Sequence, residues 1–90
     1  MDDMLATMDG PRRYAAEWDG LRLIIEPEPD HVQAFVYDPE ECDVLYTAAR
    51  ISIDAAKIAA IDFVASSRFG PRHGLDPRVI AEMLIWEPES

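Results

Sequence analysis

The chain has 90 residues, of which 49% are hydrophobic, and its net charge is −10. This length gives one small domain, and the hydrophobic content excludes general disorder, which requires a chain poor in apolar residues. The single cysteine, Cys42, excludes an intramolecular disulfide framework and a cysteine-ligated zinc cluster. Since no charged-then-apolar leader opens the chain and no apolar run approaches the ~18 residues of a membrane span, we expect a cytoplasmic protein without membrane contact.

The first eleven residues show no packing pattern. They are acidic and rich in methionine, and they end in Gly10-Pro11, a pair that interrupts regular structure. Because termini without packing partners fray, we expect a flexible N-terminus over residues 1–11 and a single domain over residues 12–90.

A β-hairpin is predicted at the start of the domain. Residues 12–18 and 21–26 alternate in the manner of strands, and Asp19-Gly20 lies between them. This dipeptide predicts a type I′ turn, since both of its central positions need positive φ. The second strand is expected to place three residues on the core face, namely Leu21, Leu23 and Ile25.

Two further strands follow, each preceded by a proline-containing turn. Residues 26–30 and 38–41 cannot be strand interior, because proline lacks the backbone donor that a sheet requires. Residues 31–37 carry apolar side chains on both faces, which indicates a strand that is covered on both faces or central in the sheet. Residues 43–50 complete a four-stranded antiparallel meander.

A long helix is predicted from Ser52, which suits the N-cap, to about Phe69, before Gly70-Pro71. One apolar face of this helix carries Ile53, Ala56, Ala60, Phe63 and Val64. A second stripe, well round the helix, carries Ile58, Ile61, Ala65 and Phe69. One sheet cannot cover both faces, so the second stripe needs another cover.

A short C-terminal helix is expected to open at Asp76-Pro77 and to run to about Trp86, with no strand after it. It is the obvious cover for the second stripe, although docking on a second subunit is equally open. The predicted fold class is therefore α+β: a four-stranded antiparallel meander with a long helix on one face and a short helix beside it. The apolar residues proposed as a partner interface are Ile58, Ile61, Phe69, Met83 and Trp86.

Negative charge concentrates in the first half of the chain. Residues 1–49 hold twelve acidic residues against three arginines, a net charge of −9, whereas residues 50–90 hold six against five basic residues, a net charge of −1. An acidic surface repels phosphate backbones, so direct nucleic-acid binding is not expected. The charge suits a basic protein partner, and plain solubility is the alternative explanation.

Three clusters contain residue types that can carry chemistry. The acidic run from Glu26 to Asp43 lacks the spacing and the glycine of a calcium loop, so no metal site is assigned. Cys42 is not brought near a histidine by its spacing, and no catalytic residue or cofactor is assigned. The one basic concentration is a candidate anion site for phosphate or carboxylate, formed by Arg68, Arg72, His73 and Arg78.

Residues 21–65 resemble the HicB-type antitoxin module. The resemblance is carried by Ile25-Glu26-Pro27, by the proline turn after the next strand, and by the helix with Ser52, Ala56 and Ala60 at four-residue spacing. The chain departs from that family at residues 38–43, which replace a proline-glycine-cysteine turn, and in lacking both a glycine before the helix cap and a returning strand. The resemblance implies an acidic module that masks a basic RNA-binding partner without operator binding of its own.

Two functional hypotheses follow from the sequence. The first is a small, acidic, non-catalytic protein-interaction module that associates with itself or with a protein partner. The second is an accessory domain that binds an anion or metabolite through the basic loop 68–78.

Overall fold

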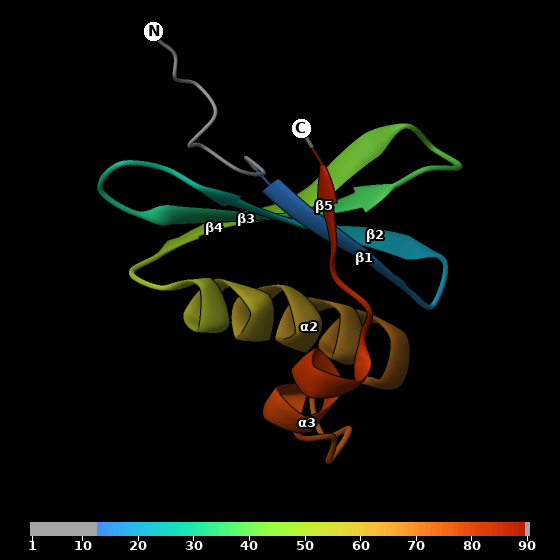
Figure 1. The fold of residues 1–90 in the computed structure, drawn as a ribbon. Coiled ribbons are helices and arrows are strands. Elements are labelled where there is room, and N and C mark those ends of the chain that lie inside the picture. Colours follow the sequence, from blue (N-terminus) through green and yellow to red (C-terminus); the bar gives the residue numbers. More distant parts are fainter. Residues whose placement is uncertain (1–12, 90) are drawn as a thin grey trace, which may run out of the picture.

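The computed structural model describes residues 13–89, so the segment 1–11 that was expected to be flexible lies outside the described residues. The elements are β1 (Arg13–Trp18), β2 (Leu21–Pro27), β3 (Val32–Asp38), β4 (Asp43–Arg50), α2 (Ile53–Phe69), α3 (Pro77–Met83) and β5 (Glu87–Glu89). The strands form one antiparallel sheet in the order β4-β3-β2-β1-β5, and both helices lie on the same side of it (Figure 1). The predicted α+β class and the four-stranded meander are confirmed, with a fifth strand added.

The β1–β2 hairpin forms around the predicted Asp19-Gly20 turn. Their φ angles are 55° and 79°, so both positions occupy the left-handed region that a type I′ turn requires. The turn fixes a register in which Trp18 lies opposite Leu21. The three residues predicted for the core face of β2 are all buried, namely Leu21, Leu23 and Ile25.

Helix α2 covers one face of the middle of the sheet, and no helix of residues 13–89 covers the other face. β3 pairs with β2 on one side and with β4 on the other, so it is an interior strand, as one of the two interpretations of its pattern required. Its residues Val32, Ala34 and Val36 are buried beneath α2, whereas Phe35 and Tyr37 on the other face are half-buried. Val36 pairs with Tyr46 and Tyr37 pairs with Val44, so Leu45 is an extra residue in β4 and marks a β-bulge.

Helix α2 has the predicted ends. The Ser52 hydroxyl accepts a hydrogen bond from the backbone N–H of Ala55 at 3.1 Å, and Gly70, with a φ of 91°, donates its backbone N–H to the carbonyl of Ser66. Ala56 and Ala60 are fully buried, and their small side chains bring the helix close to the sheet. The main core cluster contains Leu21, Leu23, Ile25, Val32, Ala34, Val36, Ala56, Ala60, Ile61 and Val64.

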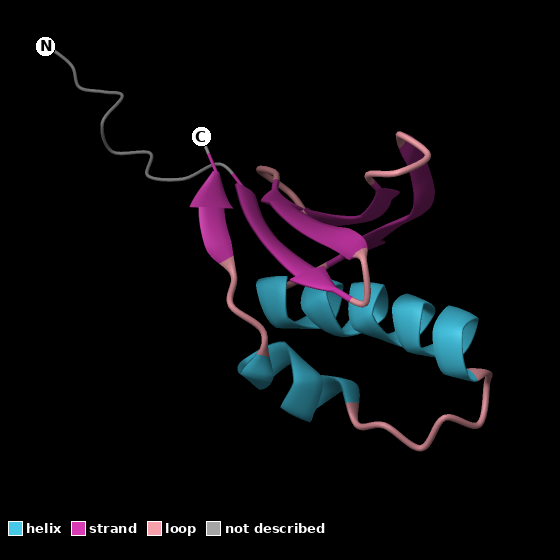
Figure 2. Ribbon diagram, turned by 90° about the vertical axis from the view of Figure 1, so that its right-hand side faces the viewer, coloured by secondary structure: helices cyan, strands magenta, loops and turns pink. Residues whose placement is uncertain are grey.

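The short helix covers the side of α2 that the sheet leaves open. Figure 2 shows α2 between the sheet and α3, and the C-terminal residues packed against the core are Ile80, Ala81, Leu84 and Trp86. The predicted N-cap is present, since the carboxylate of Asp76 accepts a hydrogen bond from the backbone N–H of Arg78 at 3.0 Å. The surplus apolar stripe is therefore satisfied mainly within the chain.

The prediction for the C-terminus was wrong in two respects. Helix α3 ends at Met83, three residues earlier than expected, and the chain returns as β5 beside β1, with Glu87 opposite Ala15. The indole N–H of Trp86 donates to the carbonyl of Ala81 at 2.9 Å, which holds the chain as it turns toward the sheet. Proline is tolerated in this strand because β5 lies at the sheet edge.

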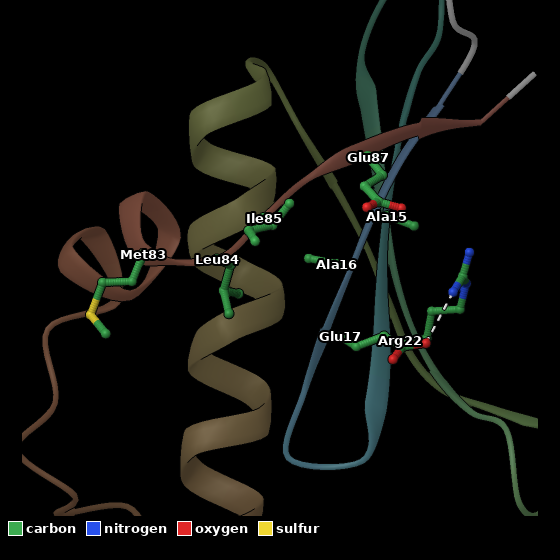
Figure 3. Close-up of a pocket in the computed structure, with 8 residues that line it drawn as sticks. All are labelled: Ala15, Ala16, Glu17, Arg22, Met83, Leu84, Ile85 and Glu87. Atoms are coloured by element: carbon green, nitrogen blue, oxygen red, sulfur yellow. Dashed lines mark hydrogen bonds and ion pairs between the residues drawn. The ribbon is translucent and has the colours of Figure 1, made fainter.

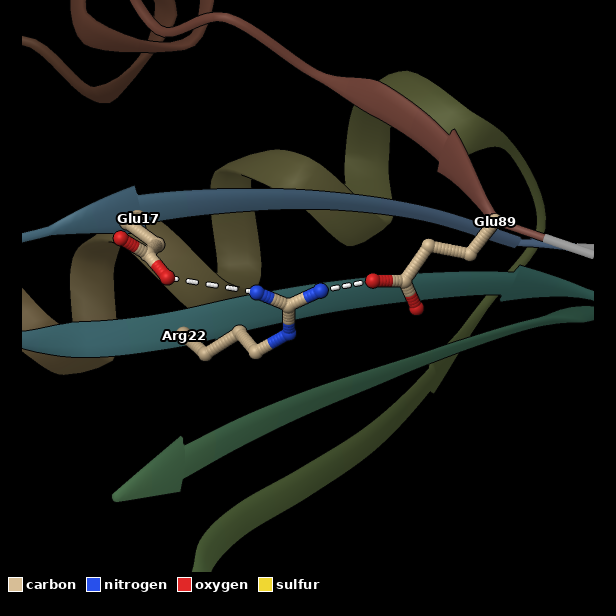
Figure 4. Close-up of polar contacts among 3 residues, drawn as sticks. All are labelled: Glu17, Arg22 and Glu89. Atoms are coloured by element: carbon tan, nitrogen blue, oxygen red, sulfur yellow. Dashed lines mark hydrogen bonds and ion pairs between the residues drawn. The ribbon is translucent and has the colours of Figure 1, made fainter. Parts of the chain in front are cut away.

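An arginine on β2 links the new strand to the sheet. Arg22 makes ion pairs with Glu17 of β1, at 3.3 Å, and with Glu89 of β5, so it bridges three strands (Figure 4). Arg13 of β1 pairs with Glu26 of the neighbouring strand β2, at 3.0 Å. No helix within residues 13–89 is long and apolar enough to cross a membrane.

Candidate functional site

Four carboxylates gather where β3 turns into β4. The side chain of Asp38 shapes the turn by accepting hydrogen bonds from the backbone N–H groups of Glu40, at 3.0 Å, and Glu41, at 3.4 Å. Asp43 begins β4 opposite Asp38. Within residues 13–89 none of these four side chains has an ion-pair partner. The acidic turn, as we call Asp38, Glu40, Glu41 and Asp43, therefore presents uncompensated negative charge to solvent.

Apolar side chains border the acidic turn on the sheet face that neither described helix covers, which we call the open face (Figure 1). Tyr37 lies opposite Val44 there, and Phe35 lies opposite Thr47. Val44 is 49% exposed and the adjacent Leu45 is 42% exposed. An antiparallel sheet commonly turns a polar face to water, so the exposed apolar residues beside the acidic turn depart from the usual pattern.

Tyr37 keeps its proton at neutral pH. The neighbouring side chain of Cys42 and, to a smaller extent, the negative charge of Asp38 raise the pKa of Tyr37 above its usual value of 10. Cys42 itself is exposed, has a φ of 54° and donates its thiol to the carbonyl of Pro39 at 3.7 Å. The phenol can therefore act as a hydrogen-bond donor beside the acidic turn.

The acidic residues of the two hairpin turns do not converge. The β2–β3 turn, with Asp30 and His31, and the acidic turn lie at opposite ends of β3 (Figure 1). The imidazole Nδ1 of His31 lies 2.7 Å from a carboxylate oxygen of Asp30, and this hydrogen bond raises the pKa of His31 and lowers that of Asp30. Over the described part of the chain, no three His, Cys, Asp or Glu side chains are grouped to hold a metal ion.

A cleft of about 470 Å³ opens beside β1, where the chain leaves α3 for β5 (Figure 3). Its apolar wall is formed by Ala15, Ala16, Met83, Leu84 and Ile85, and its charged side chains are Glu17, Arg22 and Glu87. Because Arg22 already pairs with Glu17 and Glu89, its charge is not free to hold an anion in the cleft. Among the described residues that line it there is no serine, threonine, cysteine, lysine or histidine.

The structure separates the four residues of the predicted anion site. Arg68 pairs with Asp19 through its Nε at 2.9 Å, near the C-terminal end of α2. Arg78 instead lines a second cleft, of about 380 Å³, beside Ile58 on the N-terminal half of α2. Ten residues of helix separate positions 58 and 68, about 15 Å along the axis, so Arg68 and Arg78 do not share a site.

The remaining two residues of that set are also not aimed at one point. The Nδ1 of His73 accepts the backbone N–H of Leu75 at 2.9 Å, and its Nε2 lies 3.5 Å from a carboxylate oxygen of Asp62. Arg72 is exposed on the loop between the helices. The predicted anion site is therefore dispersed, with Arg68 and His73 engaged by carboxylates of the chain itself.

The residues proposed as a partner interface fall into three environments. Ile61 is fully buried in the core, so it is not available to a partner. Ile58 lines the 380 Å³ cleft, and Trp86 is partly buried with Lys57 Nζ 5.0 Å from its ring centre. Phe69, 54% exposed, has its ring 6.3 Å from that of Trp18, and Met83 is 73% exposed. Phe69 and Met83 alone of these five are largely exposed.

No protein-family model, curated protein or solved structure matches this chain. Its function is therefore inferred from the surfaces described above.

Sequence reasoning missed the apolar part of the open face. Alternation predicts a strand over residues 43–50 with Val44 and Leu45 on opposite faces, and nothing in that pattern indicates the bulge at Leu45 or the exposure of both side chains. The signal that could have found them is their position beside the proline-containing turn 38–42, next to a strand edge. The exposed Ile85 was missed for another reason, because it was assigned to a helix that ends at Met83.

Proposed function

We propose that this chain is a small, acidic, non-catalytic protein-interaction module that binds a basic protein partner through the acidic turn and the adjoining open face. One observation carries the proposal: four carboxylates without an ion-pair partner in residues 13–89 adjoin the exposed side chains of Val44 and Leu45. Protein interfaces combine an apolar contact area with complementary charge at its rim. This surface has both parts.

The placement of potentially reactive groups supports binding without chemistry. Within residues 13–89 no charged or polar side chain is fully buried, whereas catalytic groups usually depend on burial to shift their pKa values. Cys42 and His31 belong to turns at opposite ends of β3, so they cannot form the hydrogen-bonded pair that activates a thiol. The described residues that line the candidate clefts include no serine, threonine, cysteine, lysine or histidine, and their carboxylates belong to exposed residues.

Electrostatics favours a basic partner. Residues 1–49, which include β1 to β3 and all of β4 except Arg50, carry a net charge of −9, and the four carboxylates of the acidic turn have no ion-pair partner within residues 13–89. An electrostatic field of one sign increases the rate at which the chain encounters an oppositely charged protein. Added salt screens this field and lowers that rate. The antitoxin-like resemblance of residues 21–65 gives this partner a narrower description, a small basic RNA-binding protein whose surface the module masks.

The proposal is tested by retention of a basic protein on the immobilised full chain. The wild type is exposed to native extract at 50 mM NaCl, and retained proteins are identified by mass and by elution at 500 mM NaCl. We expect a basic protein that elutes with salt, and at least a tenfold lower affinity for the Glu40→Gln, Glu41→Gln double variant.

The matched control is the Asp54→Asn, Glu82→Gln double variant, which removes the same charge from exposed helical positions. It should retain the partner as the wild type does. Either the absence of any salt-eluted basic protein or equal loss in the two variants would contradict the proposal.

A further inference from the structure

Strand β4 ends the sheet on the side away from β5, and its outer edge carries backbone N–H and C=O groups that no other strand of residues 13–89 pairs. It has eight residues, and six of them are exposed. Proteins usually protect such edges with lysine, proline, a β-bulge or very short strands, because an open edge accepts another strand. β4 has a bulge at Leu45 near its start but is eight residues long. β4 contains neither lysine nor proline, and its two charged residues, Asp43 and Arg50, stand at its ends.

We infer that β4 pairs antiparallel with β4 of a second copy of this chain, forming a symmetric dimer with a continuous sheet. This inference rests on the proposed function in treating the chain as an interaction module, and it names one of the partners. The strand itself favours a second copy as its partner. A two-fold axis places the first residue of β4 in one copy beside the last residue of β4 in the other. Asp43 and Arg50 make those two ends complementary.

The bulge in β4 brings these charges into register. Residues that lie directly opposite each other in antiparallel strands have side chains on the same face of the sheet. Arg50 lies opposite the buried Val32, so its side chain is on the helix side. Asp43, opposite Asp38 and two positions from the buried Val36, lies on that side too. When the bulge pair Val44 and Leu45 is counted as one position, both charges stand three positions from Thr47. An axis at Thr47 therefore pairs Thr47 with Thr47, Tyr46 with Ala48, and Asp43 with Arg50.

Neither charge is satisfied by the other inside one copy. They lie at opposite ends of a strand about 20 Å long. Within residues 13–89 Asp43 has no ion pair, and the guanidinium of Arg50 donates to the carbonyl of Ala49, at 2.8 Å, and to no carboxylate. The symmetric register makes two Asp43–Arg50 pairs at once.

The residue after β4 adds apolar contact. Ile51 is 95% exposed, so nearly all of its apolar surface is available for contact. The same register extends to place it beside the turn 39–42 of the second copy. It also brings that acidic turn toward the N-terminal end of α2, whose dipole favours negative charge. The two acidic turns stay at opposite ends of the dimer.

The test measures the mass of the full chain by light scattering after size exclusion, from micromolar to millimolar concentration. We expect twice 10.1 kDa for the wild type. Asp43→Arg places like charges opposite each other twice, and should raise the dimer dissociation constant at least tenfold. The combination of Asp43→Arg with Arg50→Asp restores opposite charges in the same register and should restore the dimer.

The control variant is Glu82→Arg, which makes the same change in net charge on α3 and should dimerise as the wild type does. Circular dichroism confirms that each variant is folded. A monomeric wild type at every concentration overturns the inference, as does a dimer that Asp43→Arg leaves unchanged or that the double variant does not restore. None of these results bears on the proposed binding of a basic protein, which is measured separately by retention at low salt.

Discussion

The burial of Ile61 can be tested by truncating its side chain. Sequence patterning placed this residue on a surface available to a partner, whereas in the structure it is fully buried with Val64 and Ala60. Ile61→Ala removes three carbon atoms, worth roughly 2.4 kcal/mol at about 0.8 kcal/mol for each buried methylene group. The cavity left behind adds to this loss, so we expect the free energy of unfolding to fall by about 3–4 kcal/mol.

The matched control is Met83→Ala, because Met83 belongs to the same proposed interface but is 73% exposed. Its expected loss is within about 0.5 kcal/mol. A domain of this length typically has a free energy of unfolding of roughly 5–13 kcal/mol, so both variants should fold.

The assay is urea unfolding followed by circular dichroism. With a slope of about 1 kcal/mol per molar urea, typical of a small domain, Ile61→Ala should lower the midpoint by about 3 M. The midpoint of Met83→Ala should stay within about 0.5 M of the wild type. Similar small losses in the two variants would refute the assignment of Ile61 to the core.

Three further predictions concern local structure. Gly20→Ala should lower the melting temperature by roughly 4–8 °C, because position 20 has a φ of 79° although a Cβ there meets nothing within 4 Å; an unchanged melting temperature would argue against the type I′ turn. Ser52→Ala should reduce the free energy of unfolding by about 1 kcal/mol, with Ser52→Asp restoring it, and equal stability of all three proteins would exclude the cap. The pKa of His31 is raised above 6.5 by Asp30, so its contribution to stability is complete below pH 6.5 and is lost as pH rises through the folded-state pKa. Asp30→Asn should lower the pKa of His31 toward 6.5 in an NMR titration, and a pKa that does not move would remove that contact.

The parts of the fold that were predictable are those decided by nearby residues. Asp19-Gly20 specifies its turn because few other pairs adopt positive φ at two successive positions. Ser52 and Gly70 specify the ends of α2 through hydrogen bonds that span three or four residues. These interactions form wherever the local chain allows them, so they can be recognised without the tertiary structure.

The parts that were not predictable depend on distant partners. β5 carries a proline and no strand-like alternation, and it forms because β1 offers a free edge and Arg22 reaches Glu89. Ile61 is buried because both the sheet and the C-terminal segment enclose α2, which helical spacing alone could not show. The residues of the basic loop are close in sequence but not in space. Arg68 lies at the C-terminal end of α2, whereas Arg78, on α3, lies beside Ile58 on the N-terminal half of α2.

The two edges of the sheet differ in what they can accept. β5 has three residues, of which one is a proline without a backbone donor and two are glutamates, whereas β4 is long and uncharged along its middle. A further strand can thus add at β4 and is disfavoured at β5. In the dimer inferred above, growth through β4 would stop at two molecules, since the joined sheet would have a β5 strand at each end. The C-terminal strand would then make that assembly finite, because neither of its outer edges favours a further strand.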